Sequence, residues 1–320
     1  MTFDEKTLQA IGALLRQANR ILIIPHKAPD GDALGAALAL YQTFKVMGKS
    51  PSIVCLDAPA EVFAFMPHIE QVQAGQPTLD YDAYFIVDAG ATHLTGFHES
   101  HPQLFDKSLP VVNIDHHPTN PFFGRYNVVV STAASATMIV FELLQALELS
   151  IDRDTATCLL TGLYTDTGSF MHSNTTPETL RVGAKLLEKG ANLRAISKEI
   201  FNTLKISTMH LWGRVLRNAY QTSECVTMSV VTQKDFEECE ANYEEMTGVV
   251  DYINSIPGAQ YSVILTERDG KVKGSLRTLK EEINVNNIAA AYGGGGHAKA
   301  AGFTVPGRLE KEIRWKAVDR

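Results

Sequence analysis

Acidic and histidine side chains that can bind metal ions occur in four short segments of the first half of the sequence. The candidate metal ligands among them are His26, Asp30, Asp32, Asp88, His116 and Asp166. Imidazole nitrogens combined with carboxylates suit manganese, zinc, iron or cobalt better than calcium, which prefers oxygen ligands only. Two such ions that share a bridging carboxylate make a hydroxide available near neutral pH and neutralise charge on a phosphoryl oxygen. These residues therefore indicate a two-metal phosphoester hydrolase.

Helix capping is the alternative explanation for single aspartates in these segments. An Asp that follows a strand commonly caps a helix, and Asp88 or Asp166 taken singly fits that alternative equally well. Clustered carboxylates without cations would also repel one another and raise each other's pKa, so a metal site is the simpler account. Caps explain two longer patterns poorly, namely His26-x-x-x-Asp30-x-Asp32 and Asp115-His116-His117.

The elements that must position these residues alternate between strands and helices. The unbroken apolar run at 21–24 predicts a strand buried on both faces, as in a parallel sheet. Further strands are expected at 52–56, 84–87 and 111–114. Helical patterns occupy 4–19, 33–47, 135–147 and 153–163. This alternation predicts an α/β domain with a doubly wound, mainly parallel sheet, in which ligand sites gather at the carboxyl ends of the strands.

The second half of the chain has a different pattern. Residues 192–221 are helical in pattern, and strand-like segments follow at 226–231, 261–267 and 272–276, with a helix expected at 243–255. We therefore expect a smaller α+β domain with its own sheet, joined to the first domain by a helical linker. The expected boundaries are a catalytic domain at 1–190, a linker at 191–222 and a substrate-binding domain at 223–320.

A glycine cluster near the end of the chain, at 293–296, is followed directly by His297. Glycine runs let backbone N–H groups point into one concavity, where they bind anions. A flexible linker is the alternative, but the continuation His-x-Lys-Ala-Ala-Gly-Phe is unusual for a linker. A local basic patch precedes the cluster and comprises Lys271, Lys273, Arg277 and Lys280. Each of these lysines could equally lie on a solvated strand face.

These motifs, taken in order, resemble the four motifs of the DHH phosphoesterases. That superfamily includes RecJ-type exonucleases, family II inorganic pyrophosphatases and the nanoRNase/pAp phosphatases, and the compact chain is most similar to the last branch. The resemblance implies that Asp88 bridges two metal ions. It assigns one ion to His26, Asp30 and Asp88. It assigns the other to Asp32, Asp88, His116 and Asp166.

The resemblance also implies roles in catalysis and substrate binding. Asp88, Asp115 and His117 would be the catalytic residues. His117 would contact the phosphate or help protonate the leaving group, and Asp115 would orient a histidine. In the segment similar to a DHH-associated C-terminal domain, the residues implied to bind substrate are Arg277, Gly295, Gly296 and His297. Arginine suits phosphate because its planar fork binds two oxygens at once.

Two positions depart from the family pattern and concern substrate preference rather than metal chemistry. Family members often carry an arginine a few residues after the second motif, where this chain has Thr92-His93-Leu94. After the fourth motif, Met171 and His172 stand where basic or aromatic residues are common.

Composition limits the partners of the protein. A formal charge of −7 and a pI of about 5.8 argue against binding of long nucleic acid, which usually needs a basic face. Four scattered cysteines, no signal peptide and no apolar run of membrane-spanning length predict a soluble, cytoplasmic protein without a membrane partner. A homodimer is compatible with the sequence.

The favoured hypothesis is hydrolysis of short RNA oligonucleotides (nanoRNA), 3′-phosphoadenosine 5′-phosphate (pAp), or linear or cyclic dinucleotides. Two divalent ions are expected, with Mn²⁺ favoured and Mg²⁺, Co²⁺, Fe²⁺ or Zn²⁺ as alternatives. An inorganic pyrophosphatase or short polyphosphatase is the second enzymatic hypothesis. A non-enzymatic nucleotide sensor is the third, although a degenerate relative should have lost at least one ligand, and all are present here.

Overall fold

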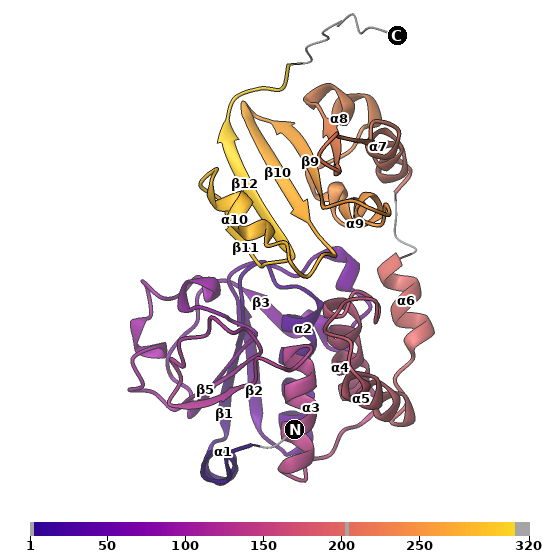
Figure 1. Ribbon diagram of the computed structural model, residues 1–320. Coiled ribbons are helices and arrows are strands. Elements are labelled where there is room, and N and C mark those ends of the chain that lie inside the picture. The colour runs from indigo at the N-terminus through magenta and orange to yellow at the C-terminus, as the bar shows by residue number, and fades with distance from the viewer. Residues whose placement is uncertain (1–2, 202–204, 311–320) are drawn as a thin grey trace, which may run out of the picture. The chain divides into compact units, whose positions relative to one another are not determined.

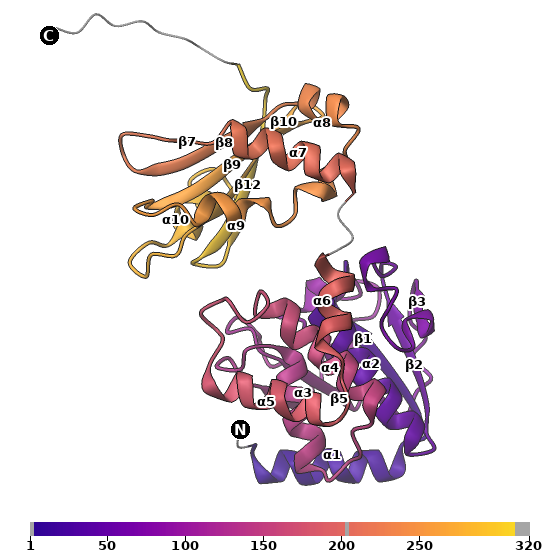
Figure 2. The same cartoon turned by 90° about the vertical axis from the view of Figure 1, so that its right-hand side faces the viewer.

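The computed structural model describes residues 3–201 and 205–310 of the chain. It divides into two compact units, Met1–Thr203 and Leu204–Arg320, so the division falls within the expected linker. The two helices of that segment belong to different units. Helix α6 (Leu193–Phe201) packs against α4 (Arg153–Asp166) in the first unit, as Figure 2 shows, whereas α7 (Ile206–Arg217) packs against the sheet of the second.

The first unit is built on a six-stranded sheet in the order β3-β2-β1-β4-β5-β6, in which every neighbouring pair is parallel. The strands are β1 (Arg20–Pro25), β2 (Ser50–Cys55), β3 (Val72–Ala74), β4 (Ala83–Val87), β5 (Val111–Asp115) and β6 (Tyr126–Val129). This confirms the expected parallel sheet. The chain reverses its direction of winding between β1 and β4, which is where open α/β sheets bind ligands.

Both faces of this sheet are covered, which explains its unbroken apolar runs. Ile21 and Ile23 face a core shared with the helices, whereas Leu22 and Ile24 face a second core with Phe97. The helices of the unit besides α4 and α6 are α1 (Glu5–Gln17), α2 (Gly31–Val46), α3 (Ala136–Ala146) and α5 (Pro177–Glu188). Helices α2, α3 and α4 pack on one another in Figure 1. The unit also contains short 3-10 segments, which are η1 (Glu61–Phe63), η2 (Ile69–Gln71), η3 (Thr92–Thr95) and η4 (Pro102–Leu104). Phe63 of η1 and Ile69 of η2 pack in the first core, whereas Leu104 of η4 lies in the second.

The second unit has its own mixed sheet, in the order β11-β12-β10-β9-β8-β7. Its strands are β7 (Tyr220–Gln221), β8 (Val226–Val231), β9 (Tyr261–Arg268), β10 (Lys271–Arg277), β11 (Gly295–Gly296) and β12 (Ala300–Pro306). The pair β8–β9 is parallel and the other pairs are antiparallel. Figure 1 shows α10 (Val285–Ala290) on one side of the sheet and, on the other, α7, α8 (Gln233–Cys239) and α9 (Val249–Asn254). The expected α+β domain is present.

One local expectation for the second unit was wrong. The single helix expected at 243–255 is a 3-10 turn, η5 (Tyr243–Met246), followed by α9, because Thr247 is extended and Gly248 adopts a φ of 90°. The glycine cluster is not only a loop, since β11 pairs with Gly302 and Ala301 of β12. In the part of the chain that the structure describes, no helix has both the length and the apolar character needed to cross a membrane.

Candidate metal centre

Three neighbouring strands of the first sheet end beside one another, and each is followed by a candidate metal ligand. His26 follows β1, Asp88 follows β4 and His116 follows β5. The helices supply the remaining three ligands: Asp30 caps the N-terminus of α2, Asp32 lies in the first turn of α2, and Asp166 is the last residue of α4. The capping alternative therefore applies to Asp30, whose Oδ1 accepts hydrogen bonds from the backbone N–H of the second and third residues after it.

Asp88 lies at the centre of the cluster and faces a histidine with each carboxylate oxygen. Its Oδ2 is 3.5 Å from His26 Nε2, and its Oδ1 is 3.5 Å from His116 Nε2. The side chain is only 3% exposed, and no described group donates a hydrogen bond to Oδ1. A φ of 56° places Asp88 in the left-handed region, which aspartate tolerates better than most residues. A buried carboxylate oxygen without a donor is unfavourable unless a cation completes its environment.

The donor atoms fall into three groups whose members lie within 4.8 Å of one another. His26, Asp30 and Asp88 form one group. Asp32, His116 and Asp166 form another, and Asp88 with His116 and His117 forms the third. Within these groups, the distances from His26 Nε2 to Asp30 Oδ1 and from His116 Nε2 to Asp166 Oδ2 are 3.7 and 3.8 Å.

These separations are too long for direct hydrogen bonds, which measure roughly 2.7–3.2 Å. They suit donors arranged around a shared ion at about 2.0–2.2 Å from each ligand atom. The residues therefore fit two divalent cations. Asp88 belongs to the group of His26 and to one group of His116, and His116 also belongs to the group of Asp32 and Asp166. His26 is oriented for this role because its Nδ1 donates to the carbonyl of Lys27 at 2.8 Å, which leaves Nε2 on the side of the carboxylates.

The protonation of the cluster reflects its excess of negative charge. Burial lowers the pKa of His26 and His116, but attraction to Asp88 and the other nearby carboxylates outweighs burial and raises the two pKa values to about 11 and about 10. Burial, with repulsion from Asp88, raises the pKa of Asp166 to about 6, and burial raises that of Asp32 strongly. Burial opposes ionisation of Asp88 too, yet the two histidines hold its pKa below the usual range. Protons on these groups thus neutralise part of the carboxylate charge, which divalent cations would neutralise when bound.

Asp32 reaches the cluster because helices α2 and α4 approach closely. A Cβ atom on Gly162 of α4 would lie 2.9 Å from both Cα and Oδ1 of Asp32, and a Cβ on Gly31 would lie 2.9 Å from Thr165 Cγ2. Glycine at these positions allows α2 to lie against α4, which brings Asp32 and Asp166 into one group. No motif or spacing in the sequence connects Gly162 with the metal site.

The N-terminus of helix α3 holds the Asp32 carboxylate in place. Its Oδ2 accepts a hydrogen bond from the backbone N–H of Ala136 at 2.5 Å. Its Oδ1 accepts bonds from the N–H and the hydroxyl of Thr137, at 2.9 and 2.6 Å. A carboxylate is stabilised at a helix N-terminus by exposed N–H groups and by the helix dipole. This contact could not be predicted from the sequence, because Thr137 lies 105 residues beyond Asp32 and carries no local signal.

His117 has a different partner from the other histidines. Its Nδ1 donates to Oδ1 of Asp115 at 2.8 Å, and Asp115 is fully buried. This bond raises the pKa of His117 despite partial burial. Since Nδ1 is engaged by Asp115, His117 cannot bind a metal through that nitrogen, although Asp88 Oδ1 lies only 3.7 Å away. The geometry suits a group that orients or protonates substrate.

The four candidate substrate-binding residues lie in the second unit, at one end of its sheet. Arg277 is the last residue of β10 and is opposite Ala300, while Gly295 and Gly296 form β11. His297 and Ala300 exchange backbone hydrogen bonds and close the turn that joins β11 to β12. The structure thus brings Arg277 and the glycine-histidine turn to the same end of one sheet.

The lysines near Arg277 are engaged within the second unit. Lys273 lies 4.9 Å from the ring centroid of Tyr243. Lys299 donates to the carbonyl oxygens of Lys280, Glu281 and Ile283, so it stabilises the turn that follows β10. Arg277 itself is 35% exposed, with Nε 3.7 Å from Asp251 Oδ1.

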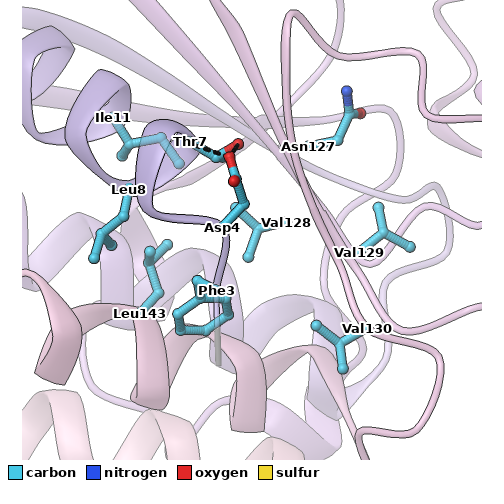
Figure 3. Close-up of a pocket in the computed structure, with 10 residues that line it drawn as sticks. All are labelled: Phe3, Asp4, Thr7, Leu8, Ile11, Asn127, Val128, Val129, Val130 and Leu143. Atoms are coloured by element: carbon cyan, nitrogen blue, oxygen red, sulfur yellow. Dashed lines mark hydrogen bonds between the residues drawn. The ribbon is translucent and has the colours of Figure 1, made fainter. Parts of the chain in front are cut away.

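A separate cavity of about 180 Å³ lies between α1 and β6 (Figure 3). Its lining is mainly apolar, and none of the candidate site residues contributes to it. The carboxylate of Asp4, its one acidic group, already accepts hydrogen bonds from the backbone and hydroxyl of Thr7. This cavity offers no cationic group to a phosphate substrate.

Comparisons with known proteins agree with the motifs and with both units. Residues 20–163 match the DHH family N-terminal domain, and residues 225–319 match the DHHA1 domain. The bifunctional oligoribonuclease and PAP phosphatase NrnA of Thermus thermophilus is 34% identical over 291 residues, which cover 90% of this chain and 84% of the relative. Its namesake from Mycoplasma genitalium is 26% identical over 94% of this chain and 93% of the relative.

The fold also matches a solved structure. An exopolyphosphatase-related protein from Bacteroides fragilis superimposes with a TM-score of 0.87, at 24% identity, over 97% of this chain and 93% of the other. The order of motifs, the His and Asp clusters and the two matched domains agree with one another. The chain therefore belongs to the DHH family of phosphoesterases and carries a DHHA1 domain after its DHH domain.

Proposed function

We propose that this phosphoesterase hydrolyses short RNA oligonucleotides and pAp with the help of two manganese ions. The observation that carries the two-ion assignment is the position of Asp88, whose Oδ2 faces His26 and whose Oδ1 faces His116. Support for the substrate comes from the Thermus thermophilus relative, whose name describes an oligoribonuclease and PAP phosphatase and which matches most of this chain. The low pI of the chain agrees with a short substrate rather than a long one.

Each side chain has a defined part in this proposal. His26, Asp30 and Asp88 hold one ion, and Asp32, Asp88, His116 and Asp166 hold the other. When bound, the ions supply a water of lowered pKa and neutralise charge on the phosphoryl oxygens. His117 holds a proton at Nδ1 against Asp115 and presents its ring to the phosphate or to the leaving oxygen. We assign substrate binding to Arg277, Gly295, Gly296 and His297 of the second unit.

A substrate panel tests the proposal. The purified chain, loaded with Mn²⁺, Mg²⁺, Co²⁺ or Zn²⁺ in turn, is given pAp, a dinucleotide, a pentanucleotide and pyrophosphate. We expect phosphate from pAp and mononucleotides from the oligonucleotides, with the highest kcat/KM in Mn²⁺. Faster hydrolysis of pyrophosphate than of every nucleotide substrate would establish the pyrophosphatase alternative and refute the proposal.

Arg277→Lys is expected to raise KM for pAp about tenfold while kcat changes little. Lysine keeps the positive charge but loses the planar fork that binds two phosphate oxygens. Loss of one such bond, at about 1.4 kcal/mol, corresponds to a factor of ten. Arg268→Lys is the matched control, because Arg268 lies at the far end of the same hairpin and pairs with Asp269. A fall in kcat at constant KM would exclude a simple binding role for Arg277.

A further inference from the structure

A series of hydrogen-bonded amides leads from the half-buried Asn127 of β6, through the buried Asn113 and Asn120, to the Asp115 carboxylate. Asn113 and Asp115 lie two residues apart on β5 and share one face, and Asn127 of β6 is the register partner of Asn113. The side-chain Nδ2 of Asn113 donates to Asn127 Oδ1 at 3.0 Å and to Asn120 Oδ1 at 2.9 Å. Asn120 lies just beyond the Asp-His-His motif and is 5% exposed.

The orientation of the Asn120 amide follows from its partners. Its Oδ1 accepts from the backbone N–H of Phe122 at 2.8 Å, and a backbone N–H can only donate. The nitrogen Nδ2 must therefore face the other way, toward Asp115 Oδ2 at 2.6 Å and the carbonyl oxygen of Ala89 at 3.1 Å. Both hydrogens of the Asn120 amide group therefore have acceptors, and these partners fix the orientation of the side chain.

These two bonds connect the two loops that carry catalytic groups. Ala89 directly follows Asp88, whose left-handed backbone positions the central carboxylate. Asp115 accepts one bond on each oxygen, from Asn120 on Oδ2 and from His117 on Oδ1. With Oδ2 fixed, the carboxylate cannot turn, and Oδ1 stays aimed at His117 Nδ1. The loops are also packed closely, since a Cβ on Gly90 would lie 2.8 Å from His117 Cβ and Cγ.

We propose that Asn120 is a positioning residue for hydrolysis, which acts through Asp115 on His117 and through Ala89 on the loop of Asp88. This inference rests on the role proposed above for His117. Asn120 is not placed to touch substrate, because its amide is surrounded by protein partners. Its contribution is to keep the His117 ring and the Asp88 carboxylate in one fixed relation while substrate binds and leaves.

Asn120→Asp tests this role with almost no change in shape. The new carboxylate faces Asp115 and the Ala89 carbonyl, so both donated bonds are replaced by repulsion. We expect kcat for pAp to fall about 10- to 100-fold, the usual cost of removing a partner that orients a catalytic imidazole, with KM nearly unchanged. Unchanged kcat in a folded Asn120→Asp protein would overturn the proposal.

Asn127→Asp is the matched control, because Asn127 belongs to the same series of hydrogen-bonded amides as Asn120 but contacts neither Asp115 nor Ala89. The substitution removes the hydrogen bond that Asn127 Nδ2 donates to the carbonyl of Gly124 at 2.7 Å. It should therefore lower the melting temperature, but kcat should not fall tenfold. If both variants lose stability and kcat in parallel, Asn120 has a structural role only and the inference is wrong.

A double variant, Asn120→Asp with Asp115→Asn, distinguishes positioning from packing and remains informative if Asn120→Asp fails to fold. It restores a hydrogen bond between the two side chains with reversed polarity. Melting temperature should recover while kcat stays low, because His117 no longer faces a carboxylate. Recovery of kcat to the native value would refute the role assigned to Asp115 and Asn120.

The outcome for Asn120 can be separated from the outcome for the proposed function. If the native enzyme hydrolyses pyrophosphate but no nucleotide, the proposed substrate is wrong. The same three variants are then compared on pyrophosphate, where a kcat loss confined to Asn120→Asp and the double variant still supports the positioning role.

Discussion

Asp88→Asn is expected to abolish metal-dependent hydrolysis while the fold is retained. The substitution keeps the size of the side chain but replaces one of the two carboxylate oxygens that face His26 and His116 with an amide nitrogen. An amide cannot bridge two cations, and its N–H group repels them. Loss of the charge stabilisation that bound ions supply amounts to several kcal/mol. The rate should therefore fall on the order of 10³-fold or more.

Metal titration and steady-state kinetics measure this effect together. Isothermal titration with Mn²⁺ should show weaker binding and fewer ions per chain in Asp88→Asn than in the native protein. Asp106→Asn is the control, since Asp106 is an exposed turn residue of the same unit that accepts a hydrogen bond from Ser108. Native turnover by Asp88→Asn at saturating Mn²⁺ would show that Asp88 does not bridge the ions.

The sequence predicted the parts of the site that depend on local spacing. Apolar runs such as 21–24 predicted strands buried on both faces. A ligand that directly follows such a strand lies at the edge of the sheet where the strands have their carboxyl ends. His26, Asp88 and His116 therefore converge as expected. The helix predicted at 153–163 is longer in the structure, where α4 continues to Asp166 as its last residue.

The sequence did not predict the contacts that orient these ligands. The bonds from α3 to Asp32 and the close approach of α2 and α4 join residues far apart in the chain, and neither has a periodic signature. In the second unit, β12 escaped prediction because it begins with Ala300-Ala301-Gly302, and only its second half carries the β-branched and aromatic side chains typical of strands. These contacts depend on how helices pack and how strands pair, and the residue pattern of a single sequence does not reveal either.

Gly162→Ala is expected to destabilise the first unit and to reduce turnover more than its stability loss explains. In an exposed helix the change would stabilise by about 0.5–1 kcal/mol. Here the added methyl would overlap Thr137 Cγ2 and lie 2.9 Å from Asp32 Oδ1. Thr137 cannot move away easily, because its χ1 is restricted and its hydroxyl is bonded to Asp32. Overpacking of this kind costs about 1–3 kcal/mol, so destabilisation prevails.

Gly12→Ala is the matched control, since Gly12 is also a helical glycine of the first unit. A Cβ there would make ordinary contacts of 3.5 and 3.6 Å, so the helix preference for alanine should raise the melting temperature. In Gly162→Ala the melting temperature should fall by a few degrees. Displacement of Asp32 by even 1 Å should lower kcat on the order of 10²-fold. If Gly162→Ala instead matched Gly12→Ala in stability and in kcat, the close approach of α2 and α4 would not be what positions Asp32.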